Sequence, residues 1–441
     1  MYLTNTKRTL GPQAMWLAVC MLAQAAGAMA QSGTYTHMTL APTPTSGSFP
    51  EGIAAGPDGA LWFTEESANN IGRSTVAGVI TEYPIPTPGS SPAQITAGPD
   101  GALWFTEFDG NNIGRITTAG VVTEYAIPTA NCGALGITRG PDGALWFVES
   151  LSTKIGRIDP AGDITEYPLT GLYGYSQYIA AGPDGALWVT FENTDYSLSS
   201  QILRVTTGGA ITVYPVPGLP AGLEEPQAIT VGSDGALWFA ETYGNIFRIT
   251  TDGVFTEYPV PLPGDGDPTQ WIAAGPDGAL WFTAACNPCS NAWVGRITTS
   301  GVITEFQTSE QYRLFGGIAP GPDGNVWFTT DALGDARHLT NSIGHLPACG
   351  LGFSASFAGS TLTMNFDLGI DTPASFNILL KNANGTKAPF SKPIAAVVPP
   401  QAFTMTWSDF PDLGTVTVEP QLSAGVGQPI CAEWTTVNTA Q

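Results

Sequence analysis

The sequence predicts an all-β protein, namely a seven-bladed β-propeller with a C-terminal β-sandwich domain. The main observation is the phrase GPDGALW, which occurs seven times with small variations, starting at residues 56, 98, 140, 182, 232, 275 and 321. The copies lie 42 to 50 residues apart, which is typical of four-stranded propeller blades. The chain also holds 53 glycines and 36 prolines but only 12% charged residues, which favours a turn-rich β fold over a disordered acidic chain.

The first thirty residues are predicted to be a cleaved signal peptide. Lys7 and Arg8 precede an apolar stretch over residues 14–30, which ends in the small residues that signal peptidase prefers. The stretch is short for a membrane span, and no later stretch supplies one. We therefore expect a secreted or periplasmic protein without membrane insertion, with a lipid anchor on Cys20 as the alternative.

The charge of the chain limits its partners. The formal net charge is −22, and removal of the signal peptide takes away two basic residues and no acidic one, which leaves about −24. A chain without a basic patch neither neutralises phosphates nor binds an anionic membrane, so nucleic acid is not expected as a partner. Cationic ligands, metal ions and neutral molecules, including glycans, remain.

The second copy shows how one blade is built. Alternation places Leu103 and Phe105 on one face of a strand and Trp104 on the other. Gly- and Asn-containing turns separate the strands. The four predicted strands are residues 95–97, 102–106, 113–117 and 121–127. We interpret the repeated tryptophans as packing between blades, with a ring of ligand-stacking platforms as the alternative.

The two ends of the repeat region are predicted to join. The seventh copy stops before a fourth strand, whereas residues 34–40, followed by Ala41 and Pro42, resemble the fourth strand at 80–86. Pairing of this segment in the last blade would leave no open sheet edge between the first and last repeats.

The composition changes after Pro347, where the repeat phrase ends. Alternation in 361–366, 376–380, 403–407 and 416–419, with a turn at Asn384 and Gly385, predicts a β-sandwich of the immunoglobulin type. The predicted organisation is a signal peptide over 1–30, a propeller over 31–347 and a sandwich over 348–441.

Five cysteines remain after removal of the signal peptide. Cys286 and Cys289 lie close together in an insertion of the sixth repeat, which favours a small loop disulfide in an exported protein. Cys349 and Cys431 bracket the last segment and are predicted to form a second disulfide. Cys132 is left without a partner.

The repeated block, clearest in residues 50–88 and 92–128, resembles the streptogramin B (virginiamycin B) lyase family over roughly residues 34–347. The resemblance implies a seven-bladed propeller. It also implies that the antibiotic-cleaving members open a cyclic depsipeptide by Mg²⁺-dependent elimination. In that family, histidines just before the first strand of two late blades act in the reaction, and two glutamates hold the metal.

The catalytic set that the resemblance implies is not present in this sequence. Elimination needs a base that titrates near neutrality, and a hard cation needs carboxylates. One histidine position holds Gln270 or Trp271, and the other holds Gly316. Leu314 replaces one metal-binding glutamate of the family, and the position of the second metal-binding glutamate falls near Asp331. We therefore leave the catalytic residues unassigned.

Polar residues nevertheless gather where strand one begins and strand two ends, because these meet at one edge of an antiparallel blade. Candidate ligand-binding residues lie just before the isoleucine of the first strand, and the amides among them have no evident repeated partner. These candidates are Glu51, Gln177, Gln227, Gln270 and Trp271. Candidate metal ligands, for Mg²⁺ or another divalent cation, mostly lie three residues after the tryptophan: Glu65, Glu107, Glu149, Glu241 and Asp331. As the alternative, these glutamates form structural ion pairs with the arginine that recurs in each blade.

Three functions remain open on this basis. The first is a binding module that lacks the family's catalytic histidines and holds a small polar or glycan-like ligand at the axial rim. The second is an active Mg²⁺-dependent C–O lyase that uses carboxylates in place of histidines. The third is a structural or adhesive envelope protein.

Overall fold

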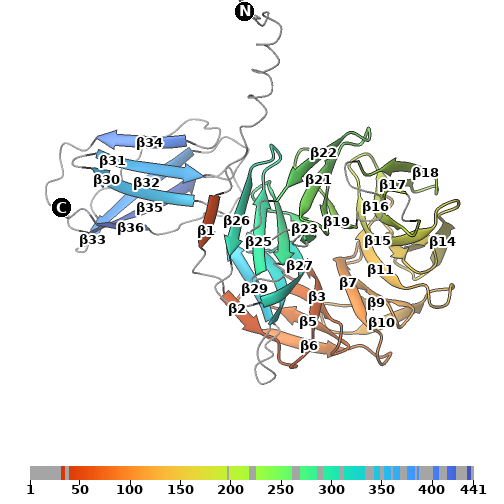
Figure 1. Cartoon of the computed structure of the whole chain (residues 1–441). Helices are drawn as coiled ribbons and strands as arrows, with labels where there is room; N and C mark the ends of the chain where they lie inside the picture. Colours follow the sequence, from red (N-terminus) through yellow and green to blue (C-terminus); the bar gives the residue numbers. More distant parts are fainter. Residues whose placement is uncertain are drawn as a thin grey trace, which may run out of the picture.

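The computed structural model shows a seven-bladed propeller (Figure 1). It describes residues 31–34, 39–195, 198–217, 225–260, 269–285, 292–307, 312–332 and 342–347. In the C-terminal segment it describes residues 352–358, 361–367, 375–382, 385–386, 401–406, 415–423 and 435–438. The described residues form strands and turns and contain no helix, so none of them makes a helix that could cross a membrane.

Each blade contains four antiparallel strands, which in blades one to six follow the order of the chain from the axis outward. Blades one to three are β3 (Pro50–Ala55), β4 (Leu61–Glu65), β5 (Asn70–Ser74) and β6 (Ile80–Pro84); β7 (Pro92–Ala97), β8 (Leu103–Glu107), β9 (Asn112–Ile116) and β10 (Val122–Ala126); and β11 (Ala134–Arg139), β12 (Leu145–Glu149), β13 (Lys154–Ile158) and β14 (Ile164–Pro168). Blades four and five are β15 (Gly174–Ala181), β16 (Ala186–Asn193), β17 (Gln201–Thr206) and β18 (Ile211–Pro215); and β19 (Pro226–Val231), β20 (Leu237–Glu241), β21 (Asn245–Ile249) and β22 (Phe255–Pro259). Blades six and seven are β23 (Thr269–Ala274), β24 (Leu280–Ala285), β25 (Ala292–Ile297) and β26 (Ile303–Gln307); and β27 (Tyr312–Pro320), β28 (Asn325–Ala332), β29 (Ser342–Pro347) and β2 (Thr39–Pro42).

The inner strands form a closed ring around the axis. Each of β3, β7, β11, β15, β19 and β23 contacts the inner strand of the next blade, and β27 contacts β3. The predicted seven-bladed propeller is therefore confirmed.

The N-terminal segment completes the last blade, as predicted. Strand β2 pairs antiparallel with β29, with Thr39 opposite His345 and Pro42 opposite Ser342 (Figure 1). The pairing begins at Thr39 rather than at Thr34. Residues 31–34 instead form β1 (Gln31–Thr34), which pairs in parallel with β26 and adds a fifth strand to blade six. The sequence did not predict this strand, which covers an otherwise free sheet edge.

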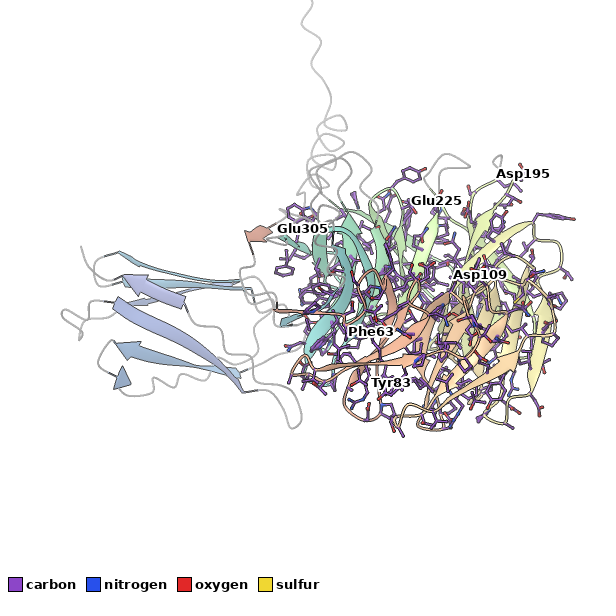
Figure 2. All side chains as sticks on the ribbon, turned by 90° about the horizontal axis from the view of Figure 1, so that it is seen from below. Phe63, Tyr83, Asp109, Asp195, Glu225 and Glu305 are labelled. Atoms are coloured by element: carbon purple, nitrogen blue, oxygen red, sulfur yellow. The ribbon has the colours of Figure 1, made fainter. Side chains whose placement is uncertain are left out.

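The repeated tryptophans pack between blades, as predicted. All seven are at most 1% exposed. Trp62 lies in one apolar cluster with Leu103 and Phe105 of blade two. Trp327 of blade seven lies in a cluster with Phe63 of blade one, so the same contact closes the ring. Phe63 is inside the packed propeller in Figure 2.

A hydrogen-bonded unit of aspartate, tryptophan and arginine fixes the turn before each second strand. In blade one, Trp62 Nε1 donates to Asp58 Oδ1 at 3.0 Å, and Arg73 Nε donates to Asp58 Oδ2 at 2.7 Å. Burial opposes ionisation of Asp58, but the hydrogen bonds from Trp62 and Arg73 outweigh it and lower its pKa. The same unit recurs as Asp100, Trp104 and Arg115; Asp142, Trp146 and Arg157; Asp184, Trp188 and Arg204; Asp234, Trp238 and Arg248; and Asp277, Trp281 and Arg296.

The alternative expected from the sequence, in which the repeated arginines form ion pairs with the glutamates, is therefore wrong. In the described residues the repeated arginines pair with the turn aspartates, as in Arg115 with Asp100, and not with the glutamates at the end of strand two. The reason is register: Arg115 lies directly opposite Trp104, whose indole already holds the aspartate, whereas Glu107 lies opposite Asn112.

The two glycines of the repeated turn serve different purposes. A Cβ on Gly56 would overlap the indole of Trp62, so this position must be glycine for the tryptophan to reach the aspartate. Gly59 has open space around it but a φ of +72°, which L-residues rarely adopt. The phrase is therefore a structural turn, and a strand follows it.

The chain after residue 347 forms two antiparallel sheets. One consists of β30 (Gly352–Ala358), β31 (Thr361–Asp367) and β34 (Gln401–Thr406). The other consists of β33 (Gly385–Thr386), β32 (Ser375–Asn382), β35 (Thr415–Ser423) and β36 (Thr435–Asn438). Their arrangement as a sandwich stays a prediction.

The cysteine predictions are mostly outside the described residues, which include none of Cys286, Cys289, Cys349 and Cys431. Cys132 is buried and free, and burial, with the charges of Glu149 and Glu166, raises the pKa of its thiol to about 12. This thiol is therefore protonated and unreactive at neutral pH.

We expect Asp100→Ala to lower the free energy of unfolding by about 1–3 kcal/mol, because it leaves the buried Trp104 N–H without an acceptor. Urea unfolding measures this change. Asp252→Ala is the control, since Asp252 lies in an exposed turn and should change stability little. Equal effects of the two substitutions would contradict the role of the unit.

We also expect removal of residues 31–42 to lower the melting temperature and to promote aggregation, because it exposes the edge of β29. Removal of residues 31–34 alone leaves β2 in place and should cost much less. Calorimetry and light scattering compare the two truncated chains, and closure by β2 is refuted if both melt alike.

Candidate functional site

A bulge in every inner strand positions the residues at the axis. In blade one, Pro50 pairs with Glu65 and Ile53 with Phe63, so Glu51 and Gly52 together oppose the single residue Thr64. The other six inner strands show a register shift at the same place. Such bulges redirect side chains, and here they present two residues from each blade at the end where strand one begins.

Threonines in the second strands tie neighbouring bulges together. Thr64 Oγ1 accepts a hydrogen bond from Gly52 N at 2.9 Å and donates to the carbonyl of Ala93 in the next blade at 2.7 Å. Thr329 of blade seven donates in the same way to the carbonyl of Glu51 at 2.8 Å. The axial residues are therefore held by bonds within and between blades, and Glu51 lies at the closure of the ring.

The predicted amides Gln177 and Gln227 do have repeated partners, contrary to expectation. Gln177 Nε2 donates to Glu192 Oε2 at 3.0 Å, and Gln227 Nε2 donates to Thr242 Oγ1 at 3.0 Å. Each partner lies fifteen residues after its glutamine: Glu192 near the end of β16, and Thr242 directly after β20. The equal spacing could have revealed this pairing in the sequence.

Glu51 differs from these amides because the residue fifteen positions later, Glu66, is also acidic. Burial, with the charge of Glu66, raises the pKa of Glu51 to about 7. No hydrogen-bond donor among the described side chains reaches its carboxylate. Glu51 is therefore a carboxyl group that is costly to ionise.

Two aromatic rings meet near the axis. Tyr178 of blade four and Trp271 of blade six have ring centroids 5.3 Å apart, at 76° to each other. Ala228, at the corresponding position of blade five, is small and lies in the same apolar cluster. Burial, followed by the charge of Glu51, raises the pKa of the Tyr178 hydroxyl, which places Glu51 and Tyr178 within electrostatic reach of each other.

The sequence singled out Trp271 but missed Tyr178 and Gln94, which occupies the same bulge position in blade two. The Nε2 atom of Gln94 is buried without a partner among the described residues. The signal was available, because three other blades hold glycine at this position: Gly52, Gly136 and Gly317.

The two base positions of the resembled family hold unsuitable residues. A Cβ on Gly316 would collide with Thr329 Oγ1 and would lie 2.7 Å from the carbonyl oxygen of Pro50. Strand β27 has a second register shift, between Tyr312 and Leu314, and its glycines let it lie against β3. Gln270, at the corresponding position of blade six, carries an amide that cannot take a proton near neutrality.

The four predicted metal glutamates are completely buried and lie in four separate blades. In each blade the carboxylate interacts with a second glutamate on the outer strand, so the pairs are Glu65 with Glu82, Glu107 with Glu124, Glu149 with Glu166, and Glu241 with Glu257. Burial, aided by the neighbouring carboxylate, raises the pKa of Glu65 and of Glu107 to about 7.

These residues do not fit a Mg²⁺ centre. The structure does not bring the four carboxylates together, and its described part contains no group of three His, Cys, Asp or Glu side chains that could hold a metal ion. The backbone of Asp331 lies opposite Leu314, which offers no oxygen ligand in its side chain. The side chain of Asp331 lies outside the described residues.

Blade three shows that the glutamate pairs are part of the blade structure. Lys154 Nζ donates to Glu166 Oε2 at 2.8 Å, and it occupies the position of Asn112 in blade two. Asn112 in turn donates to Glu107 Oε2 at 3.0 Å. The outer glutamates bind the chain that leads into their own blade, as in Thr129 N to Glu166 Oε1 at 2.8 Å.

Two acidic residues lie on loops of neighbouring blades. Asp195 and Glu225, from blades four and five, lie toward the upper margin of the propeller in Figure 2. The charge of Glu225 also acts on Glu192, whose pKa burial raises. Glu192 and Glu225 therefore lie near each other at the end of the propeller where Glu51 lies.

The model of the virginiamycin B lyase family matches residues 8–190, 94–268 and 173–349 of the chain. A streptogramin B lyase structure is 35% identical, with a TM-score of 0.60, covering 70% of this chain and 96% of that one. A catalytically inactive histidine-to-alanine variant of the virginiamycin B lyase from Staphylococcus aureus, with quinupristin, is 34% identical (TM-score 0.61, 70% and 98% covered). The hydrazine synthase of Kuenenia stuttgartiensis is 14% identical (TM-score 0.50, 68% and 96% covered) and shares the fold alone.

We expect stability to fall as the pH rises from 5 to 8. Glu51, Glu65 and Glu107 have pKa values of about 7 in the fold but ordinary values when unfolded. Between those values the folded chain binds more protons, so the free energy of unfolding decreases with pH. Urea titrations at pH 5, 6, 7 and 8 measure the slope, and Glu65→Gln should flatten it. An unchanged slope in that variant would contradict the assignment.

Proposed function

Because the chain belongs to the virginiamycin B lyase family, we propose that it is an exported propeller that binds a small ligand at its axial residues without the family's elimination reaction. The chain shares the fold of the family but lacks the histidines that the resemblance places in the catalytic site. The predicted signal peptide supports export, and the formal net charge of −22 argues against nucleic acid as the ligand.

The observation that carries the proposal is the surroundings of Gly316. The resemblance places a catalytic histidine there, but the neighbouring carbonyl of Pro50 leaves no space for a Cβ. Elimination needs a positioned base for the proton alpha to a carbonyl, and neither Gly316 nor Gln270 supplies one. The described residues also lack a metal centre of the expected kind.

A relative supports retention of ligand after loss of a histidine. The Staphylococcus aureus lyase variant is catalytically inactive and was crystallised with quinupristin. In this chain, Glu51, Tyr178 and Trp271 offer a carboxylate and two rings at the axis. A few polar groups beside aromatic surface are typical of small-molecule sites. We place the ligand at these residues, with Gln177 and Gln227 at the rim.

A second candidate function has one observation in its favour. Glu51 has a pKa of about 7, which suits a general base at neutral pH. In that case the chain would be an active lyase in which Glu51 takes the place of the histidine. We rank it second because the described residues contain no cluster that could hold the metal ion on which the family's elimination depends.

The C-terminal segment forms part of the same proposal. Its two antiparallel sheets, of three and four strands, have the strand content of a β-sandwich. We propose that it folds as a separate sandwich domain. An adhesive role would then belong to this domain and not to the axial site.

Incubation with quinupristin and Mg²⁺ at pH 7.5, followed by mass spectrometry, tests the proposal. We expect intact depsipeptide after incubation, in contrast to a family lyase run in parallel. Ring opening that disappears in Glu51→Gln would establish the second candidate. Ring opening that survives in that variant would refute both assignments.

We also expect Gly316→Ala to lower the melting temperature by several degrees, because a Cβ there meets the backbone of β3. Gly208→Ala is the matched control, since its surroundings are open. Calorimetry distinguishes them. Equal stability of the two variants would show that position 316 has room for a side chain.

A further inference from the structure

The corner formed by Tyr178 and Trp271 has the geometry of an aromatic cation site. The two rings stand at 76°, with centroids 5.3 Å apart, so they form two adjoining walls rather than a stack. Ring faces attract organic cations, and perpendicular walls allow two faces to contact one ammonium group. Trp271 is 8% exposed, which limits competition from water.

Glu51 lies within electrostatic reach of this corner, and no described basic side chain pairs with it. Its charge acts on the Tyr178 hydroxyl. The nearby charge that acts on Glu51 is that of Glu66, a second carboxylate. A largely buried carboxylate is ordinarily paired, because burial of an isolated charge is costly. A ligand cation would supply the missing partner.

The described basic side chains are committed elsewhere. Six arginines pair with the turn aspartates, at the opposite end of strand two from this site. Lys154 pairs with Glu166, and Arg139 is exposed at the far end of β11. None of these described side chains neutralises Glu51.

The surroundings favour a cation that also carries an apolar part. Glu192 and Glu225 add negative charge at the same end of the blades, which raises the local concentration of cations. Exposed aromatic rings lie on the adjoining chain segments, with Tyr173 76%, Tyr175 41% and Tyr243 43% exposed. Tyrosines of this kind provide contact area for an organic ligand.

We propose that the axial site recognises a small organic cation, a substituted ammonium, between the rings of Tyr178 and Trp271 and the carboxylate of Glu51. This proposal rests on the proposed function and specifies its ligand class. The ammonium would supply the cation that no described side chain provides to Glu51. A neutral molecule of the same shape would leave that carboxylate unpaired.

Choline chloride is the probe, and its neutral isostere 3,3-dimethylbutanol is the matched ligand. Isothermal titration and thermal shift of the chain over residues 31–441, in 150 mM NaCl at pH 7.5, measure both. We expect choline to bind and the isostere to bind at least about tenfold more weakly. Glu51→Gln should weaken choline binding about tenfold or more, and Trp271→Leu should do the same. Glu51→Gln keeps the shape of the side chain, so it remains informative if Trp271→Leu does not fold.

Asp109→Asn is the control variant. Asp109 carries the same charge on a loop of blade two, where it accepts a hydrogen bond from Ser91 at 2.6 Å, and its replacement should leave choline binding unchanged. Equal binding of choline and the isostere would overturn cation recognition but would leave a ligand-binding propeller standing. Equal weakening by Glu51→Gln and Asp109→Asn, or no binding of choline, would overturn the site. Ring opening of quinupristin would instead refute the proposed function.

Discussion

The fold depends on one hydrogen-bonded unit, in which a turn aspartate binds the indole of a buried tryptophan and the guanidinium of an arginine. Buried indole N–H groups need an acceptor, and the aspartate provides it while also holding the turn. With the indole fixed, its ring packs on the next blade, and the ring of blades closes through the same contact between Trp327 and blade one. Blade seven keeps the aspartate and tryptophan, with Trp327 Nε1 3.0 Å from Asp323 Oδ1, although His345 stands in the arginine's place.

The candidate site residues lie where the repeat is broken. Every inner strand has a bulge, but the bulge residues differ from blade to blade. Glycine at this position lets strands approach closely, as Gly317 does against Glu51. Tyr178 and Trp271 replace such glycines and occupy the axis instead. A family propeller could thus lose one chemistry and gain another recognition site without a change in its blades.

Much of the fold could be predicted from the sequence because the repeat carries it. The phrase GPDGALW predicted the blades, and the missing fourth strand of the last copy predicted closure by the N-terminal segment. The site was harder, because its residues meet across blades that are far apart in sequence. Gln270 and Trp271 were found by comparison of repeats, whereas Tyr178 requires knowledge of which bulge residues reach the axis. The partner of the repeated arginine was misassigned, because turn geometry and not strand order brings Asp58 to Arg73.

The central claim is that this chain keeps the propeller of a Mg²⁺-dependent lyase family without its metal-dependent site. Thermal unfolding of residues 31–441 after chelation, with and without added Mg²⁺ or Ca²⁺, tests it most directly. Binding to the native state alone would raise the melting temperature. We predict the same melting temperature in all conditions at constant ionic strength. A clear increase with Mg²⁺ that chelation reverses would contradict the account and would make elimination the leading function.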